Sequence, residues 1–286
     1  MPDDFAPPLW LGCLALGVLG LGVAVWSAVY WRFMRGSAPL ARRRLRRPPW
    51  GWEGAILAGL YLFSAVFAAL SAGPAPADEA EPIAMDLELV ASQLAIMTLF
   101  SATALALIVA RHRPRKLTLR DFGLGWGATR TAGDIATGVA AAAAMLPLVY
   151  AVNLAMVLIT GDRTPHPAIE SLMGDPTGHT LLATAILAVV AAPLFEEFAF
   201  RVLLQGGLQR VAGKHAWWPV AASAVAFGLA HAGHGVAPVA IVVLALGLGY
   251  VYRQTHSFAA VVAMHMAFNS VSLSVAYAAL RAGAEL

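Results

Sequence analysis

Charged residues and cysteine are both scarce in this sequence. Asp, Glu, Lys and Arg together make up 12% of the 286 residues, about half the share that is usual in soluble domains. A chain so poor in charge cannot cover a water-facing surface, which excludes an ordinary cytosolic enzyme, a disordered chain and a nucleic-acid-binding domain. The one cysteine, Cys13, excludes a disulfide framework and a zinc site built from cysteines.

The signature motifs of several enzyme classes are also absent. The sequence contains no His-Glu-x-x-His, which excludes a zincin-type membrane protease. It has neither the Gly-x-Ser-x-Gly elbow of serine hydrolases nor the Gly-x-Gly-Asp of membrane aspartyl proteases. Nucleotide-binding GxGxxG and P-loop motifs are missing as well. The candidates for chemistry are therefore the polar residues inside apolar segments.

Long apolar segments fill most of the chain. Hydrophobic residues make up 59% of it, and the mean hydropathy is +0.71. A transmembrane helix needs about 20 mostly apolar residues. The sequence predicts an all-α fold, a polytopic membrane helix bundle of about eight transmembrane helices, at residues 8–31, 51–72, 89–110, 133–160, 181–203, 217–233, 236–252 and 257–280.

The loops between these segments predict the orientation. On one side lie 17 of the 19 Lys and Arg residues, including the run at 42–47 and Arg201 at the end of the fifth segment. The opposite loops are acidic. The positive-inside rule places both termini outside the cytoplasm. The Ala-, Arg- and Gly-rich composition favours a bacterial plasma (inner) membrane, and binding of anionic membrane lipid by the basic run is compatible with this topology.

Ionisable and polar groups within the predicted spans are concentrated in the last third of the chain. Such groups disfavour insertion by about 2.5–3.5 kcal/mol each, so each is a functional candidate. The set comprises Glu196, Glu197, Arg201, His231, His234, His265 and Asn269.

Helical spacing sorts these residues. Glu197 and Arg201 are four residues apart and can pair on one helix face. Glu196 is rotated by about 100° from that pair, which leaves its carboxylate free to act as a general base. His265 and Asn269 also share a face.

If the fifth and sixth segments are antiparallel, Glu196 and His231 lie at similar depth in the membrane. The polar residues of the three segments can then meet in the cytoplasmic half of the bundle. The sixth and seventh segments are short, so either the bundle is thin there or the loop at 233–238 re-enters.

Two chemistries fit a glutamate, two histidines and an asparagine in a membrane cavity. In the first, Glu196 takes a proton from water held by His231, and His265 and Asn269 donate hydrogen bonds to an oxyanion. In the second, Glu196, His231 and His265 bind Zn²⁺, which activates the water. We favour the metal-free mechanism with no cofactor, because no cysteine or clear third histidine ligand is available. His234 is the residue that could supply a further zinc ligand and so support the zinc alternative.

Three motifs in this order resemble a known family. They are Glu196-Glu197-x-x-x-Arg201, Phe227-x-x-x-His231 and His265-x-x-x-Asn269. Together they resemble the CPBP family (also called Abi) of intramembrane endopeptidases, which includes CAAX proteases and bacteriocin-processing proteins and is related to the Ras-converting CAAX endopeptidase. The resemblance covers about residues 180–275.

The resemblance implies roles close to those that the residues suggest. Glu196 and His231 correspond to the catalytic pair, and His265 and Asn269 to the oxyanion site. Glu197, Arg201 and Phe227 would be supporting residues. The family has been described both as metalloproteases and as metal-independent glutamate proteases. The implied substrate is a membrane-associated or lipidated peptide or protein.

The resemblance also divides the chain. Residues 76–286 would form the protease core, with the motifs within 190–275. Residues 1–75 would add two N-terminal transmembrane helices and a basic cytoplasmic loop. A second hypothesis is a non-proteolytic membrane scaffold, an immunity protein or a proton- or ion-coupled transporter that uses the same polar residues. Confinement of those residues to one half of the chain argues against a transporter, which is expected to have paired broken helices in two halves.

Overall fold

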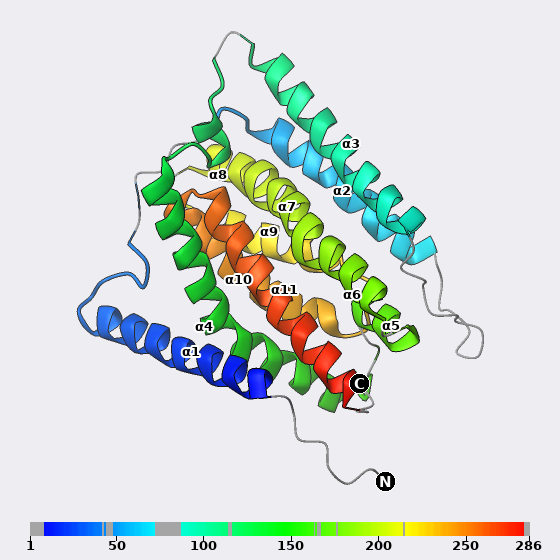
Figure 1. Cartoon of the computed structure of the whole chain (residues 1–286). Helices are drawn as coiled ribbons and strands as arrows, with labels where there is room; N and C mark the ends of the chain where they lie inside the picture. Colours follow the sequence, from blue (N-terminus) through cyan, green and yellow to red (C-terminus); the bar gives the residue numbers. More distant parts are fainter. Residues whose placement is uncertain are drawn as a thin grey trace.

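The computed structural model describes residues 9–41, 43, 48–71, 87–113, 116–162, 164, 167–175, 177–213 and 215–282, and no β-strand occurs within these ranges. The elements form a helical bundle (Figure 1), which confirms the all-α, polytopic membrane fold. In chain order they are α1 (Leu9–Met34), α2 (Trp52–Ser71), α3 (Leu87–Arg111), η1 (Leu119–Phe122), α4 (Ala128–Thr160), α5 (Pro167–Gly174), α6 (Gly178–Thr184), η2 (Ala185–Ala191), α7 (Ala192–Glu196), η3 (Glu197–Gln205), α8 (Gly206–Ala212), α9 (Trp218–Leu229), α10 (Ala237–Thr255) and α11 (Phe258–Arg281).

Six of the helices in the described ranges are long and apolar enough to cross a membrane. The other two predicted spans are shorter apolar helices, at Trp52–Phe67 within α2 and at Trp218–Leu229. The 12 residues of α9 reach only about 18 Å, against a hydrocarbon core of about 30 Å. Gly233 and Gly235 adopt positive φ angles in the turn that follows, so the chain reverses before α9 could reach full length.

The centre of the bundle is built from α4, α10 and α11. In Figure 1, α11 runs along α4, and these two helices share the most extensive contact. A side chain at Gly138 of α4 would come within 2.1 Å of the Ala260 carbonyl oxygen of α11. Only glycine allows the two backbones to approach so closely. α10 packs against both α4 and α9.

A helical run from Gly178 to Ala212 carries the first motif. It comprises α6, η2, α7, η3 and α8, and it extends nine residues beyond the predicted end at residue 203. Arg201 is therefore not at the cytoplasmic end of a span, as the charge pattern of the loops had predicted. It lies inside the helix with no exposed side-chain surface, because pairing with Glu197 stabilises its charge there.

The first two helices make different contacts with the rest of the bundle. α2 packs against η3, and Trp50 just before it is buried and donates its indole N–H to the Val202 carbonyl at 3.0 Å. α1 packs on α4, where Trp26 donates to the Ala144 carbonyl. The first residue of α1 and the last of α11 lie at the same end of the bundle (Figure 1). The division of the chain near residue 75 stays a prediction, and of the basic run at 42–47 only Arg43 is among the described residues.

Candidate active site

Two π-helical segments flank the glutamate pair. η2 ends one residue before α7, and η3 begins at Glu197, so Glu196 closes a five-residue α-helical turn between them. A π-helix pairs residue i with i−5, so each hydrogen-bonded ring holds one more residue than in an α-helix, and such segments are frequent at functional sites. The uniform 100° spacing assumed from the sequence therefore does not hold along this helix.

Glu197 lies between two bases. Its Oε2 atom is 3.1 Å from Nε of Arg201, and its Oε1 atom is 3.0 Å from Nδ1 of His265 on α11. The side chains of Glu197 and Arg201 have no exposed surface. Arg201 also lies over the ring of Phe227, with 4.8 Å from its guanidinium carbon to the ring centroid. The pair of Glu197 and Arg201 thus connects the first motif with Phe227 of the second and His265 of the third. An unpaired charge in this place would be strongly destabilising.

Glu196 faces two imidazoles. Its carboxylate oxygens lie 3.9 Å from Nε2 of His231 and 3.8 Å from Nε2 of His265. The glutamate side chain is 13% exposed, so it is enclosed but not sealed. These separations are too long for direct hydrogen bonds.

The other nitrogen of each imidazole fixes its orientation. Nδ1 of His231 lies 2.8 Å from the carbonyl oxygen of Phe227. A carbonyl only accepts, so we assign the hydrogen to Nδ1 of His231, and by the same reasoning to Nδ1 of His265 beside the Glu197 carboxylate. In both rings, Nε2 is therefore the nitrogen that faces Glu196. His231 itself lies in the turn just after α9, not within a span.

Asn269 lies one helical turn beyond His265 on α11. Its side-chain amide donates to the backbone carbonyl of Ala188 in η2, at 2.7 Å. One of the two amide hydrogens is therefore engaged with the helix that carries Glu196, and the second is not used in this bond.

Two residues near the site were not predicted. Ser223 of α9 receives a hydrogen bond from Arg201 at 3.4 Å and donates to the Phe200 carbonyl at 2.8 Å. Its position four residues before Phe227 would have placed it on the same face of the helix. Tyr61 of α2 packs edge-on against Phe195, 4.7 Å between ring centroids, and lies within electrostatic range of Glu196. Nothing in the sequence links it to residues so far along the chain.

His234 lies beside the site in the turn between α9 and α10. Its ring is 5.7 Å from that of His231, edge to face. Burial, with a smaller contribution from His231, lowers the pKa of His234 to about 4. Within the described parts of the chain, no group of three or more His, Cys, Asp or Glu residues is arranged to hold a metal ion.

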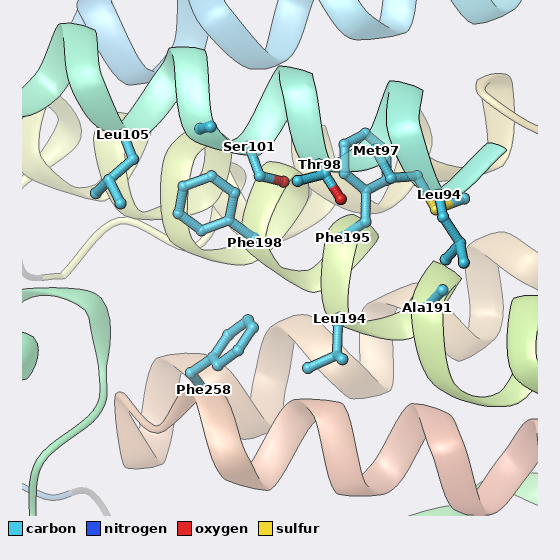
Figure 2. A pocket seen from close by; sticks show the side chains of 11 residues that line it. Leu94, Met97, Thr98, Ser101, Leu105, Ala191, Leu194, Phe195, Phe198 and Phe258 are labelled. Carbon is cyan, nitrogen blue, oxygen red and sulfur yellow. The ribbon is translucent and has the colours of Figure 1, made fainter. Parts of the chain in front are cut away.

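An apolar groove runs beside the same helix. Figure 2 shows it between α3 and the α7–η3 region, with Phe195 and Phe198 directed toward α3. Its volume is about 510 Å³, and Thr98 and Ser101 are the polar side chains among the described residues that line it. The groove adjoins the site through Phe195, which immediately precedes Glu196.

Comparison with known proteins identifies the region that holds these residues. Residues 178–271, about a third of the chain, match the family model described as type II CAAX prenyl endopeptidase Rce1-like. Neither the curated proteins nor the solved structures yielded a match. The match confirms the family predicted from the motifs, and it includes Glu196, Glu197, Arg201, Phe227, His231, His265 and Asn269.

The family and the helices together define the class of protein. The chain is an integral, multi-pass membrane protein with a region similar to the Rce1-like CAAX prenyl endopeptidase family. That family supports an intramembrane endopeptidase as the general function.

Proposed function

We propose that this Rce1-like membrane protein hydrolyses a peptide bond in a membrane-associated or lipidated peptide or protein, with Glu196 as the general base. One observation carries the proposal. The Glu196 carboxylate lies 3.8–3.9 Å from Nε2 of both His231 and His265, within the region that matches the family. A carboxylate beside two imidazoles is suited to activating a water molecule.

In the proposed reaction, water attacks the scissile carbonyl carbon while Glu196 takes one of its protons. His231 holds the attacking water through Nε2, and its Nδ1–H bond to Phe227 keeps the ring oriented. The resulting tetrahedral intermediate carries an oxyanion. Glu196 then gives its proton to the amide nitrogen as the C–N bond breaks, which yields a carboxylic acid and a free amine, and the acid loses its proton to water.

The oxyanion needs hydrogen-bond donors. We assign this role to His265, through its Nε2 atom, and to the amide hydrogen of Asn269 that Ala188 does not receive. Glu197 and Arg201 support the site by fixing the His265 ring. The alternative in which Glu196, His231 and His265 bind zinc has no step in this mechanism, and metal removal tests it directly.

The apolar surroundings support the proposed substrate. The groove in Figure 2 has room for a hydrocarbon chain beside the helix that carries Glu196, and pockets of this size hold small apolar ligands. The matched family is described by its prenylated CAAX substrates. We therefore expect a lipid-modified or membrane-embedded peptide to be cleaved faster than the same peptide free in water.

Cleavage of quenched fluorescent peptides by the purified protein in liposomes tests the proposal. Glu196→Gln keeps the shape of the side chain and removes the base, so kcat/KM should fall by about 10²–10⁴-fold. Glu53→Gln is the matched control, because Glu53 also belongs to an apolar helix and contacts a histidine, His112, at 3.0 Å. That variant should keep wild-type activity.

Two further arms separate the alternatives. Peptides with and without an isoprenyl group on a C-terminal CAAX cysteine compare lipidated with unmodified substrate. Treatment with a chelator should leave the activity intact. Loss on chelation with recovery on adding zinc would replace the metal-free mechanism. Full activity of Glu196→Gln would refute the assignment of Glu196 as the base and would point to a contaminating protease. Absence of cleavage by the wild-type protein would favour the non-proteolytic scaffold.

A further inference from the structure

The bond between Asn269 and Ala188 joins the two helices that make the site. Asn269 and His265 lie four residues apart on α11. His265 reaches Glu196 and Glu197, whereas Asn269 reaches the carbonyl of Ala188 in the π-helical segment before them. The helix that carries the glutamates is therefore attached to α11 at two points, one helical turn apart.

The Ala188 carbonyl has a specific reason to need a partner. In η2 the backbone N–H of Ala192 bonds to the Leu187 carbonyl, which is the i to i−5 pairing of a π-helix. The next bond of this series would run from residue 193 to Ala188. Residue 193 is proline, which has no backbone N–H. The chain cannot complete the series, so the Ala188 carbonyl loses its backbone donor.

Within a membrane bundle, water does not readily replace that donor. An unpaired carbonyl in apolar surroundings is destabilising, and side chains of neighbouring helices commonly restore the bond near a proline. Asn269 does so here at 2.7 Å. Without that bond, the π-helical turn would be free to relax toward the α-helical register, which would rotate the residues that follow, Glu196 included.

We propose that Asn269 is a positioning residue, which acts on Glu196 by supplying the hydrogen bond that Pro193 cannot make to Ala188. This bond holds the π-helical turn and so sets Glu196 between His231 and His265. The catalytic consequence rests on the proposed function above, whereas the structural role does not. The role is additional to any contact of the second amide hydrogen with an oxyanion.

A double-mutant cycle between positions 193 and 269 tests the proposal. Pro193→Ala restores a backbone N–H that can reach Ala188, and Asn269→Leu removes the donor with little change of volume. With Pro193 in place, Asn269→Leu should lower Tm by about 2–4 °C or more and kcat by about 10–100-fold, the loss expected from a misplaced catalytic group. In the Pro193→Ala background, the loss of Tm should shrink by at least half, and the loss of kcat should shrink to the part that a missing oxyanion donor alone accounts for.

Tm is measured by tryptophan fluorescence of the purified protein and requires no activity in any variant. Ser270→Ala is the matched control, since the Ser270 hydroxyl donates to Met266 within its own helix. Its effect on Tm should be the same in both backgrounds, and any effect of Pro193→Ala alone cancels in the cycle.

Three results would overturn parts of the proposal, and they are distinguishable. Equal Tm losses for Asn269→Leu in both backgrounds would show that it does not replace the missing N–H. Coupling in Tm without any recovery of kcat would limit the catalytic role of Asn269 to its donation to the oxyanion and would refute its role in positioning Glu196. A wild-type protein that cleaves none of the peptides would refute the proposed function alone, and the Tm cycle would still decide the role of Asn269.

Discussion

Two buried carboxylates in this protein have similar partners and different surroundings. Glu197 lies between Arg201 and His265 in the proposed active site. Asp134, near the start of α4, lies between Arg43, with which it forms an ion pair, and Arg130, whose Nε is 3.9 Å from its Oδ2. Neither carboxylate has any exposed side-chain surface.

The two clusters differ in how exposed their basic side chains are. Arg201 is fully buried and His265 nearly so. By contrast, the side chains of Arg43 and Arg130 are 36% and 33% exposed. Water can therefore solvate the cations around Asp134 but not the cation beside Glu197, where the pairs are also in lower dielectric and stronger. The comparison indicates that Asp134 fastens a surface segment to α4, whereas Glu197 holds a dry set of polar groups in fixed positions.

The largest expected effect comes from removing the buried cation. Arg201→Met leaves the charge of Glu197 with His265 as its one remaining basic partner among the contacts seen, because Arg201 is the residue that balances it inside the helix. Breaking a buried pair in this way destabilises a protein by about 3–5 kcal/mol. We expect a fall in Tm of several degrees, measured by tryptophan fluorescence in detergent, and loss of peptidase activity.

The double variant Glu197→Gln with Arg201→Met removes both charges and is the control for this change. It should recover most of the lost stability, because uncharged groups of similar volume are tolerated in place of a buried pair. If the double variant is less stable than Arg201→Met alone, the ion pair is not what makes Arg201 important.

The sequence distinguished these two clusters only in part. Arg130 and Asp134 have the same four-residue spacing as Glu197 and Arg201, yet only the second pair was predicted to matter, because histidines and a further glutamate accompany it in apolar segments. The basic residues at 42–47 were attributed to topology. The contact between Arg43 and Asp134 joins residues 91 positions apart, and no local pattern reports such a pairing.

The positions of the helices were predicted far better than the hydrogen-bond pattern within them. Long apolar runs specify a membrane span whatever the exact hydrogen-bond pattern, so six of the eight segments were found as long helices. Periodicity does not separate a π-helical from an α-helical turn over seven to nine residues, so η2 and η3 were missed. Pro193 was the one local signal, and it becomes informative only when Asn269 is seen to bond Ala188.

A smaller effect is expected at the exposed cluster. Arg43→Gln removes one of two arginines beside Asp134, and both are accessible to solvent. Ion pairs with exposed partners contribute about 0–1 kcal/mol and weaken with salt. Tm should fall by no more than a few degrees in low salt, and the difference from wild type should shrink at about 0.5 M NaCl. A loss as large as that of Arg201→Met would mean that exposure of the bases does not distinguish the two clusters.

The smallest expected effect separates the clusters by pH, because the turn that holds His234 lies beside the proposed site. The pKa of His234 is about 4 in the folded protein, whereas an unfolded histidine titrates near its ordinary value of about 6.5. Between these values the unfolded chain binds more protons, so stability falls as the pH drops from about 6.5 to about 4. His234→Asn should reduce this fall, measured as Tm against pH, and the exposed His215→Asn should not. An unchanged slope in His234→Asn would assign the acid sensitivity to other groups, with His231 the first to test because its ring contacts that of His234.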